Sequence, residues 1–364
     1  MSIETSRPLG NLSAGPVAVR KTADARINLS SNELAHPAAV QVLRDAWLQV
    51  LPEQARCYPR NAEDIQAIGD HFGLAGEAFQ LTPGSDVALR LIVARARSLF
   101  PDGPTLLLQS PNYPAWEEAA EREGIPVQRV GPVGADADAR TERFIAAARS
   151  APPGLMAISV PNGPMGWGTT QEQLDAVVGA AERGGHLLVV DACYQAFAGP
   201  LRASLARRGH HVAVVQSLSK SHGLAGARIS LLATSPTRLR VLGSASLEQA
   251  VGGPSLALAR AVLRRESALR PVWEEIMLTR ERARQQVRGI GLEPLPSAAN
   301  FLTVKVGPRA ARVASELSRS GYRVREFHRI DQQLDDCLRF TVTSADECGA
   351  FLSALERAVK EVAA

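Results

Sequence analysis

Short apolar runs separated by helix-length segments constrain the fold of this 364-residue chain more than any other feature. Three of them, Leu155–Val160, His186–Asp191 and Val212–Val215, show no alternation of apolar and polar positions and are too short for core helices. Runs of this kind are typical of parallel strands that are buried on both faces of a sheet. Because amphipathic segments such as 170–183 lie between the runs, the sequence predicts an α/β fold with a mostly parallel sheet covered by helices on both faces.

The pattern changes after about residue 245. The segment 256–290 predicts a long helix broken near Pro271, and the runs Asn300–Val306 and Cys337–Val342 predict two strands, the second with alternating exposure. A last helix is expected to begin at the capping box Ser344–Glu347. We therefore expect an arm over 1–36 that packs with a small α/β domain over 246–364, and a large domain over 37–245.

Composition and charge exclude several classes of protein. The formal net charge is +4, but the basic residues are dispersed among acidic ones without a basic run that contains aromatic residues, so we expect no nucleic-acid partner. No apolar run is long enough to span a membrane, and residues 1–17 lack the pattern of a signal peptide, which predicts a cytoplasmic protein. The four cysteines are scattered, and this favours reduced thiols over disulfides or a metal site.

The stretch 217–228 places a lysine and an arginine directly after the apolar run Val212–Val215. Cations at the end of a buried strand are costly unless they have partners, and either an anion or a covalent bond at the lysine amine would supply one. For a lysine considered alone, a solvated loop is the alternative. The spacing of the polar residues in the whole stretch favours the first interpretation.

That spacing resembles the lysine motif of the fold-type I pyridoxal-phosphate enzymes, and specifically that of the class I and II aminotransferases. The matching positions are Ser217, Ser219, Lys220, Gly223, Gly226 and Arg228. The resemblance implies that pyridoxal 5′-phosphate is the cofactor, with a Schiff base at Lys220 and with Ser217, Ser219 and Arg228 at its phosphate. It also implies an aspartate-aminotransferase-like fold, with a seven-stranded sheet in the large domain and a smaller α/β domain.

Other segments resemble the same family. Asp191 ends an apolar run, where a carboxylate needs a cation or a role as a cap, and with Tyr194 it matches the family's Asp-x-x-Tyr. The resemblance implies that Asp191 pairs with the pyridine nitrogen, that Tyr194 donates to the ring hydroxyl and that Tyr113 stacks on the ring. Gly84-Ser85-Asp86 matches the phosphate-binding helix start, and it also has the composition of an N-cap with free backbone N–H groups. Tyr58 matches a tyrosine that reaches the neighbouring subunit's phosphate, which implies a homodimer with a shared active site.

Substrate-binding positions are implied in the small domain and the arm. Arg339 matches the arginine that binds the substrate carboxylate, a task that suits its planar fork of donors. Asn32 and Arg325 match further positions near the substrate. The cluster of Arg323, Arg325, Arg329 and Arg339 either binds a phosphate or second carboxylate of the substrate or forms a solvated basic face. In order and length the chain is most similar to the histidinol-phosphate aminotransferase branch.

Several positions depart from the family pattern. The family's Asn-Asn-Pro-Thr-Gly is Asn162-Gly163-Pro164-Met165-Gly166 here, so a glycine stands where an asparagine normally donates to the ring oxygen. Tyr194 is then the main donor, unless Asn162 replaces the missing amide, and the pKa of the Schiff base should change. The segment Gly252–Ser255 replaces an aromatic and polar stretch. His222, beside Lys220, is either a further acid–base group or a packing residue.

Transamination of an L-amino acid to a keto acid is the function that the resemblance implies. The departures leave decarboxylation, oxidation, and cyclisation or elimination of a specialised amino acid as alternatives. A non-catalytic pyridoxal-phosphate-binding protein is a remote alternative, because the N-terminal arm of about 26 residues is too short for an attached DNA-binding module.

Overall fold

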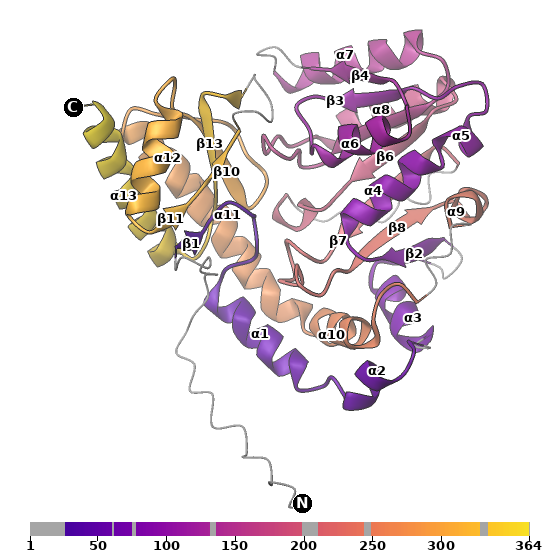
Figure 1. Cartoon of the computed structure of the whole chain (residues 1–364), viewed down its shortest axis with the longest axis horizontal. Coiled ribbons are helices and arrows are strands. Elements are labelled where there is room, and N and C mark those ends of the chain that lie inside the picture. The colour runs from indigo at the N-terminus through magenta and orange to yellow at the C-terminus, as the bar shows by residue number, and fades with distance from the viewer. Residues whose placement is uncertain are drawn as a thin grey trace, which may run out of the picture.

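The computed structural model describes residues 26–59, 62–74, 78–131, 136–198, 210–243, 249–327 and 334–363. Figure 1 shows two lobes, a larger one built on a seven-stranded sheet and a smaller one that contains the C-terminal part of the chain. Arm residues 1–25, Arg329 and the expected domain boundary near residue 245 lie outside the described residues.

The large sheet has the strand order β2-β8-β7-β6-β5-β3-β4. Neighbouring strands from β4 to β7 are all parallel, and β8 runs antiparallel to both β7 and β2. The expected mostly parallel, seven-stranded sheet is therefore confirmed. Its strands are β2 (Phe79–Thr82), β3 (Leu106–Gln109), β4 (Val127–Val130), β5 (Leu155–Ser159), β6 (Leu187–Asp191), β7 (Val212–Ser217) and β8 (Ser230–Thr234).

Successive residues of the central strands pack on opposite faces of this sheet, because side chains in a strand point to the two sides in turn. In β6, Leu187 and Val189 face one core, which contains α4 (Ser85–Ala94), α5 (Ala96–Leu99), α6 (Ala115–Arg122) and α9 (Pro236–Gly243). Leu188 and Val190 face the other core, under α7 (Ala137–Ser150) and α8 (Gln171–Arg183). Two apolar faces explain why the sequence of these strands does not alternate.

The smaller lobe contains a four-stranded antiparallel sheet of order β12-β13-β10-β9. The arm joins this lobe, because β1 (Ile27–Asn28) pairs in parallel with β11 (Tyr322–Arg323). The other elements of the lobe are β9 (Glu293–Pro294), β10 (Phe301–Lys305), β12 (Arg325–Glu326), β13 (Cys337–Thr341), α11 (Glu266–Gly289), α12 (Ala310–Arg319) and α13 (Ala345–Ala363).

A group of helices connects the two lobes along the lower edge of Figure 1. They are α1 (Pro37–Trp47), α2 (Pro52–Arg56), α3 (Ala62–His71) and α10 (Gly253–Leu263). Helices α1, α3 and α10 share one apolar core with α11 and the small sheet, and α2 lies against α10 without a buried residue of its own. None of the helices in the described ranges is both long and apolar enough to cross a membrane.

Two predictions for the C-terminal part are wrong. The segment 256–290 forms two helices, α10 and α11, and Pro271 lies inside α11 without breaking it. Pro271 removes one backbone hydrogen bond near the start of α11, whereas Leu269, Val272 and Ile276 bury a continuous face, and this packing dominates. Strand β13 does not alternate in exposure, because both of its faces are covered. Met165, Phe327 and Leu334 pack around Cys337 on the second face, and the arm covers Thr341.

Candidate active site

A cavity of about 590 Å³ lies between the lobes, at the C-terminal ends of β5, β6 and β7. Ligands of open α/β sheets bind at this edge. The predicted site residues Gly84, Asn162 and Tyr58 do not line the cavity, although they lie in the described part of the chain. The other candidates all line it, namely Asn32, Ser85, Asp86, Tyr113, Asp191, Tyr194, Ser217, Ser219, Lys220, Arg228, Arg325 and Arg339.

Lys220 lies in the loop after β7 and lines the cavity. Its Nζ donates a hydrogen bond of 2.7 Å to the carbonyl oxygen of Ser31 in the arm. At the start of the loop, Ser217 Oγ donates to Ser219 Oγ at 3.0 Å and accepts from the Ser219 amide at 3.1 Å. These short-range bonds fold the end of the strand so that two hydroxyl groups and an amine lie in one wall.

Asp191 ends β6 and is 8% exposed. Burial raises the pKa of its carboxyl group, and the hydrogen bond from the Cys193 amide to Oδ1, at 3.1 Å, opposes the shift only in part. A carboxylate with this degree of burial strongly favours a cationic partner. Asp191 therefore marks the point in the cavity where a ligand with a positive charge would be stabilised.

Tyr194 follows Asp191 by one turn and precedes the short 3₁₀ helix η1 (Gln195–Phe197). Its ring packs edge-on against Phe301 of β10, with the ring centroids 5.2 Å apart. Its hydroxyl oxygen accepts a hydrogen bond from Asn32 Nδ2 at 2.9 Å. Tyr194 is thus fixed by one residue of the small lobe and one residue of the arm.

Arg339 extends from β13 into the cavity, and burial lowers the pKa of its guanidinium group to about 10. Its Nη2 donates to the carbonyl oxygen of Ser30 at 2.9 Å, its Cζ lies 5.0 Å from the ring centroid of Phe301, and its buried Nε has no hydrogen-bond partner among the described residues. Arg325, which is exposed, lies opposite it in the neighbouring strand. An unpaired, buried donor on a half-buried cation favours an incoming anion.

The start of α4 and Arg228 form another part of the cavity wall. Gly84 has a φ of +88°, and a Cβ atom there would lie 2.2 Å from Arg228 Nη2, so a glycine is required. Helix α4 starts at Gly84-Ser85-Asp86 as predicted, with Gly84 as the N-cap residue and no side-chain cap, and Asp86 lies 3.6 Å from Arg228 Nη2. The first backbone N–H groups of α4 therefore remain available for an anion.

Asn162 does not act as a substitute donor in the cavity. It is fully buried, and its Nδ2 donates to Gln109 Oε1 and to the Pro111 carbonyl oxygen, each at 3.0 Å, while its Oδ1 accepts from the Met165 amide at 3.1 Å. The amide is thus committed to holding its own loop. Gly163, the next residue, does line the cavity and lies beside Tyr194.

Tyr113 and Tyr58, the other two tyrosines predicted for the site, differ in position. Tyr113 lines the cavity and is 42% exposed, and burial, followed by the negative charge of Asp86, raises the pKa of its hydroxyl group. Tyr58 is 81% exposed, in the loop after α2. Tyr58 has no part in the cavity of its own chain.

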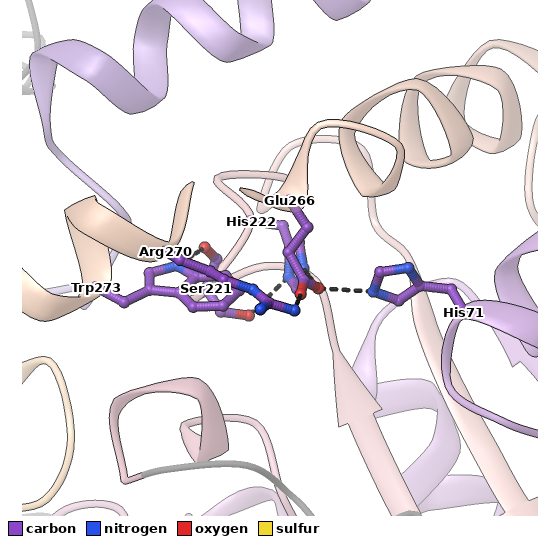
Figure 2. A network of polar contacts seen from close by, with 6 residues as sticks. All are labelled: His71, Ser221, His222, Glu266, Arg270 and Trp273. Carbon is purple, nitrogen blue, oxygen red and sulfur yellow. Dashed lines mark hydrogen bonds and ion pairs between the residues drawn. The ribbon is translucent and has the colours of Figure 1, made fainter. Parts of the chain in front are cut away.

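His222 belongs to a polar network outside the cavity (Figure 2). Glu266 Oε2 lies between two imidazole rings, 3.3 Å from His222 Nε2 and 2.6 Å from His71 Nε2. Ser221 Oγ lies 2.8 Å from His222 Nδ1, and Trp273 Nε1 donates to the Ser221 carbonyl oxygen at 2.7 Å. Of the two interpretations of His222, this environment favours packing, because the ring is 3% exposed and both nitrogens have partners.

Sequence reasoning missed the main-chain groups of the arm. The carbonyl oxygens of Ser30 and Ser31 accept hydrogen bonds from Arg339 and Lys220, and no side-chain pattern could have indicated this. It also missed Asn112 and Ser159, which line the cavity and are joined by a hydrogen bond of 2.7 Å from Ser159 Oγ to Asn112 Oδ1. Their positions directly after β3 and at the end of β5 were the available signal.

Comparisons with known proteins identify the family. The model of the family "Aminotransferase class I and II" matches residues 25–355. A histidinol-phosphate aminotransferase of Chromobacterium violaceum is 31% identical over 285 residues, which is 78% of this chain and 77% of that protein.

Two solved structures share the fold. The histidinol-phosphate aminotransferase of Sinorhizobium meliloti, in complex with pyridoxal-5′-phosphate, has a TM-score of 0.77 at 24% identity and covers 96% of this chain and 95% of its own. The aspartate aminotransferase of Thermus thermophilus with maleate has a TM-score of 0.72 at 18% identity and covers 92% and 91%. The fold is therefore aspartate-aminotransferase-like, and the chain belongs to the class I and II aminotransferase family.

Proposed function

We propose that this protein is a pyridoxal-phosphate-dependent aminotransferase that transfers the amino group of an L-amino acid to a 2-keto acid. Family membership supports the reaction class. One observation carries the proposal: a single cavity is lined by the Lys220 amine, the buried Asp191 carboxyl group, the Tyr194 hydroxyl and the Arg339 guanidinium. An amine, an acid and a carboxylate-binding cation around one space are what this reaction requires.

The residues of the cavity fit pyridoxal phosphate. Its protonated pyridine nitrogen is the cation that the buried Asp191 favours. Arg228, Ser217, Ser219 and the free N–H groups at the start of α4 provide donors for a phosphate. The fold shared with a structure that holds this cofactor supports the same conclusion. When bound, the cofactor supplies the electron sink for a carbanion at the substrate Cα.

The chain's own residues orient the substrate and move its protons. Arg339 binds the substrate carboxylate through its fork of donors, and this fixes which bond of Cα points toward Lys220. The Lys220 amine takes the Cα proton as a general base. Asp191 would hold the cofactor by its protonated ring nitrogen, and Tyr194 would donate a hydrogen bond to its ring oxygen. Arg323 and Arg325 also line the cavity, and they fit a substrate with a second anionic group.

A homodimer with a shared active site is part of the proposal. Apolar side chains are exposed at the end of α1 and around α2, where Trp47 is 58%, Leu48 83% and Leu51 57% exposed. Tyr58, 81% exposed, lies in the same part of the chain. A partner subunit on this surface would bury these side chains and bring Tyr58 to the phosphate end of the partner's cavity.

Domain division and location complete the proposal. We divide the chain into a large cofactor-binding domain over 37–245 and a small domain over 246–364, with the arm over 1–36 attached to the small domain. Pairing of β1 with β11 supports this attachment for the described arm residues. We place the protein in the cytoplasm, where thiols stay reduced, which suits its free cysteines Cys57, Cys193, Cys337 and Cys348.

Borohydride trapping of the purified protein tests the cofactor proposal. We expect reduction to fix the cofactor on Lys220, as located by peptide mass spectrometry, and Lys220→Ala to abolish the labelling. Lys305→Ala, at an exposed lysine of β10, is the matched control and should label like the wild type. Labelling that persists in Lys220→Ala, or a wild type that binds no cofactor, would contradict the proposal.

Incubation with a panel of amino acids tests the reaction. We expect keto acid to form only when a keto-acid acceptor is present, in equal amount to the new amino acid, under nitrogen as well as in air. Release of carbon dioxide would show that the reaction is decarboxylation and not transamination. Consumption of dioxygen would show that the reaction is an oxidation. Product formed without an acceptor and without dioxygen would show that it is an elimination or a cyclisation.

A further inference from the structure

Asn32 and Tyr194 form a hydrogen bond that connects the arm to the cavity. Asn32 Nδ2 lies 2.9 Å from Tyr194 Oη, although 162 positions separate the two residues in the sequence. Both residues line the cavity. The contact is therefore not a remote support but part of the wall itself.

Asn32 is held in place from several sides. Its backbone N–H donates to Thr341 Oγ1 at 3.0 Å, and its backbone carbonyl oxygen accepts from Asn300 Nδ2 at 3.1 Å. It is 1% exposed and has a φ of 54°, a backbone conformation that asparagine tolerates better than most residues with a side chain. These bonds fix the backbone of Asn32, and burial confines its side chain. The side-chain amide is therefore a firm support for the Tyr194 hydroxyl.

The direction of this bond determines where the tyrosine proton points. The NH₂ group of Asn32 faces Tyr194 Oη, and Oδ1 at the other end of the amide lies 3.4 Å from the Thr341 hydroxyl. That hydroxyl donates chiefly to the Leu29 carbonyl oxygen at 2.8 Å, and its contact with Oδ1 is a weaker second one. Tyr194 Oη is then the acceptor, and its own O–H must be directed elsewhere. A phenol oxygen that accepts one hydrogen bond also becomes a better donor in the next.

The space beside the tyrosine hydroxyl is left open by a glycine. A Cβ atom at Gly163 would lie 3.2 Å from Tyr194 Cε2 and 3.9 Å from Oη. No side chain of residue 163 therefore competes for the phenol proton. The Asn32 amide thus occupies one side of the hydroxyl group, and the open cavity remains for its proton.

We infer that Asn32 is a positioning residue that keeps the Tyr194 O–H directed into the cavity, toward the ring oxygen of the cofactor. This inference rests on the proposed function. The arm thereby contributes an amide that acts through a tyrosine, and the donor strength of Tyr194 depends on a residue that the small lobe holds in place. Asn32 needs no contact with the cofactor for this role.

A spectroscopic titration of the holoenzyme tests the inference. The visible absorption band of the cofactor bound at Lys220 changes with pH, and its pKa rises when a hydrogen bond to the deprotonated form is lost. We expect Asn32→Gly, which preserves the positive φ, to raise this pKa by about half a unit. Tyr194→Phe should raise it more, and Asn32→Gly added to Tyr194→Phe should have no further effect.

Two controls complete the experiment. Gln249→Gly changes another residue with positive φ, at 62°, that does not line the cavity, and its band should titrate as in the wild type. If Asn32→Gly does not fold, Asn32→Asp keeps the shape of the side chain and replaces the donor with an acceptor. Its shift should be larger with Tyr194 present than in Tyr194→Phe.

Two results would overturn the inference: an unchanged pKa in both Asn32 variants, or shifts of the same size with and without the Tyr194 hydroxyl. A wild type that binds no cofactor at Lys220 would instead contradict the proposed function, so the two failures are distinguishable.

Discussion

The carbonyl oxygen of Ser31 accepts a hydrogen bond of 2.7 Å from Lys220 Nζ, and the preceding carbonyl, that of Ser30, accepts one of 2.9 Å from Arg339. Adjacent peptide groups of the arm thus satisfy two cations of the cavity that come from different lobes. An amino-acid substrate has to compete with Ser30 for Arg339, and it does so with a charged oxygen in place of a neutral one. Charge-assisted bonds are about twice as strong, so the exchange favours the substrate.

Replacing Arg339 with lysine should weaken substrate binding. Lys keeps the charge but loses the planar fork, and we expect kcat/KM for the best amino acid to fall about 10- to 100-fold, mostly through KM. Steady-state kinetics measure this. Arg319→Lys, at an exposed position of α12, is the control and should leave both constants unchanged. A fall in kcat alone would argue against a role in carboxylate binding.

Replacing Gly84 with alanine should disturb the anion-binding end of the cavity. The new Cβ would lie 2.2 Å from Arg228 Nη2 at a backbone φ of +88°, so Arg228 has to move. We expect a stability loss of about 1–2 kcal/mol and a weaker affinity for pyridoxal phosphate, measured by denaturant unfolding and by fluorescence titration.

Gly103→Ala separates backbone strain from the clash. Gly103 has a φ of +102°, but nothing lies within 4 Å of a Cβ atom there. We expect it to lose stability without losing cofactor affinity. Equal cofactor affinity in both variants would show that the contact between Gly84 and Arg228 does not matter for binding.

Glu266 should make stability depend on pH. Hydrogen bonds from His222 and then His71 hold the pKa of its carboxyl group well below its usual range. Because this pKa is lower in the folded state, the stabilisation is present above the unfolded pKa of about 4.3 and is lost as the pH falls. Burial also lowers the pKa of His222, so folding is disfavoured further as the pH falls below about 6.5.

Glu266→Gln should therefore lower the unfolding free energy at pH 7.5 by about 1–2 kcal/mol and make the acid limb of the curve shallower. Urea unfolding between pH 4 and 8 measures both effects. Glu356→Gln removes an ion pair between Glu356 and Lys360 on the solvent-facing side of α13 and should change stability by less than about 0.5 kcal/mol. A curve for Glu266→Gln parallel to that of the wild type would contradict the assignment.

Replacing Leu48 with glutamate should separate the proposed dimer. Leu48 is 83% exposed next to Trp47 and Leu51, and a charge buried there without a partner would strongly oppose association. Light scattering after size exclusion should give the mass of a monomer, with reduced activity because Tyr58 is withdrawn. Leu278→Glu, at a 61% exposed position of α11, should stay dimeric. A dimer in both variants would exclude the surface around Leu48.

The parts of the fold that sequence predicts well are those with a local signal. The helix expected over 170–183 forms as α8, and its start is set within four residues by the capping box of Thr170 and Gln173. Strand β4 was not assigned, since its sequence Val-Gln-Arg-Val lies at the sheet edge and its middle residues are exposed. The helix break predicted at Pro271 was wrong, because the apolar packing of α11 outweighs the local tendency of proline to end a helix.

The site shows the same limit. Asp191 ends an apolar strand, and Lys220 and Tyr194 each follow such a strand by three residues. Their resemblance to the family motifs indicated them without a structure. Asn162 was chosen for its residue type, but its hydrogen bonds to Gln109 and Pro111 involve a neighbouring strand and loop. The contact of Asn32 with Tyr194 depends on how the arm crosses between the lobes, and a single sequence contains no periodicity that reports it.

The bond between Asn32 and Thr341 has a consequence for biosynthesis. The two residues are 309 positions apart, so at ordinary translation rates roughly 15–60 s pass between their appearance. A growing chain can assemble the large sheet with Asp191 and Lys220 during this time, but Asn32 has neither Thr341 nor Asn300 to hold it. The cavity therefore reaches its final shape only after nearly the whole chain has left the ribosome, and a nascent chain has no complete binding site for its substrate.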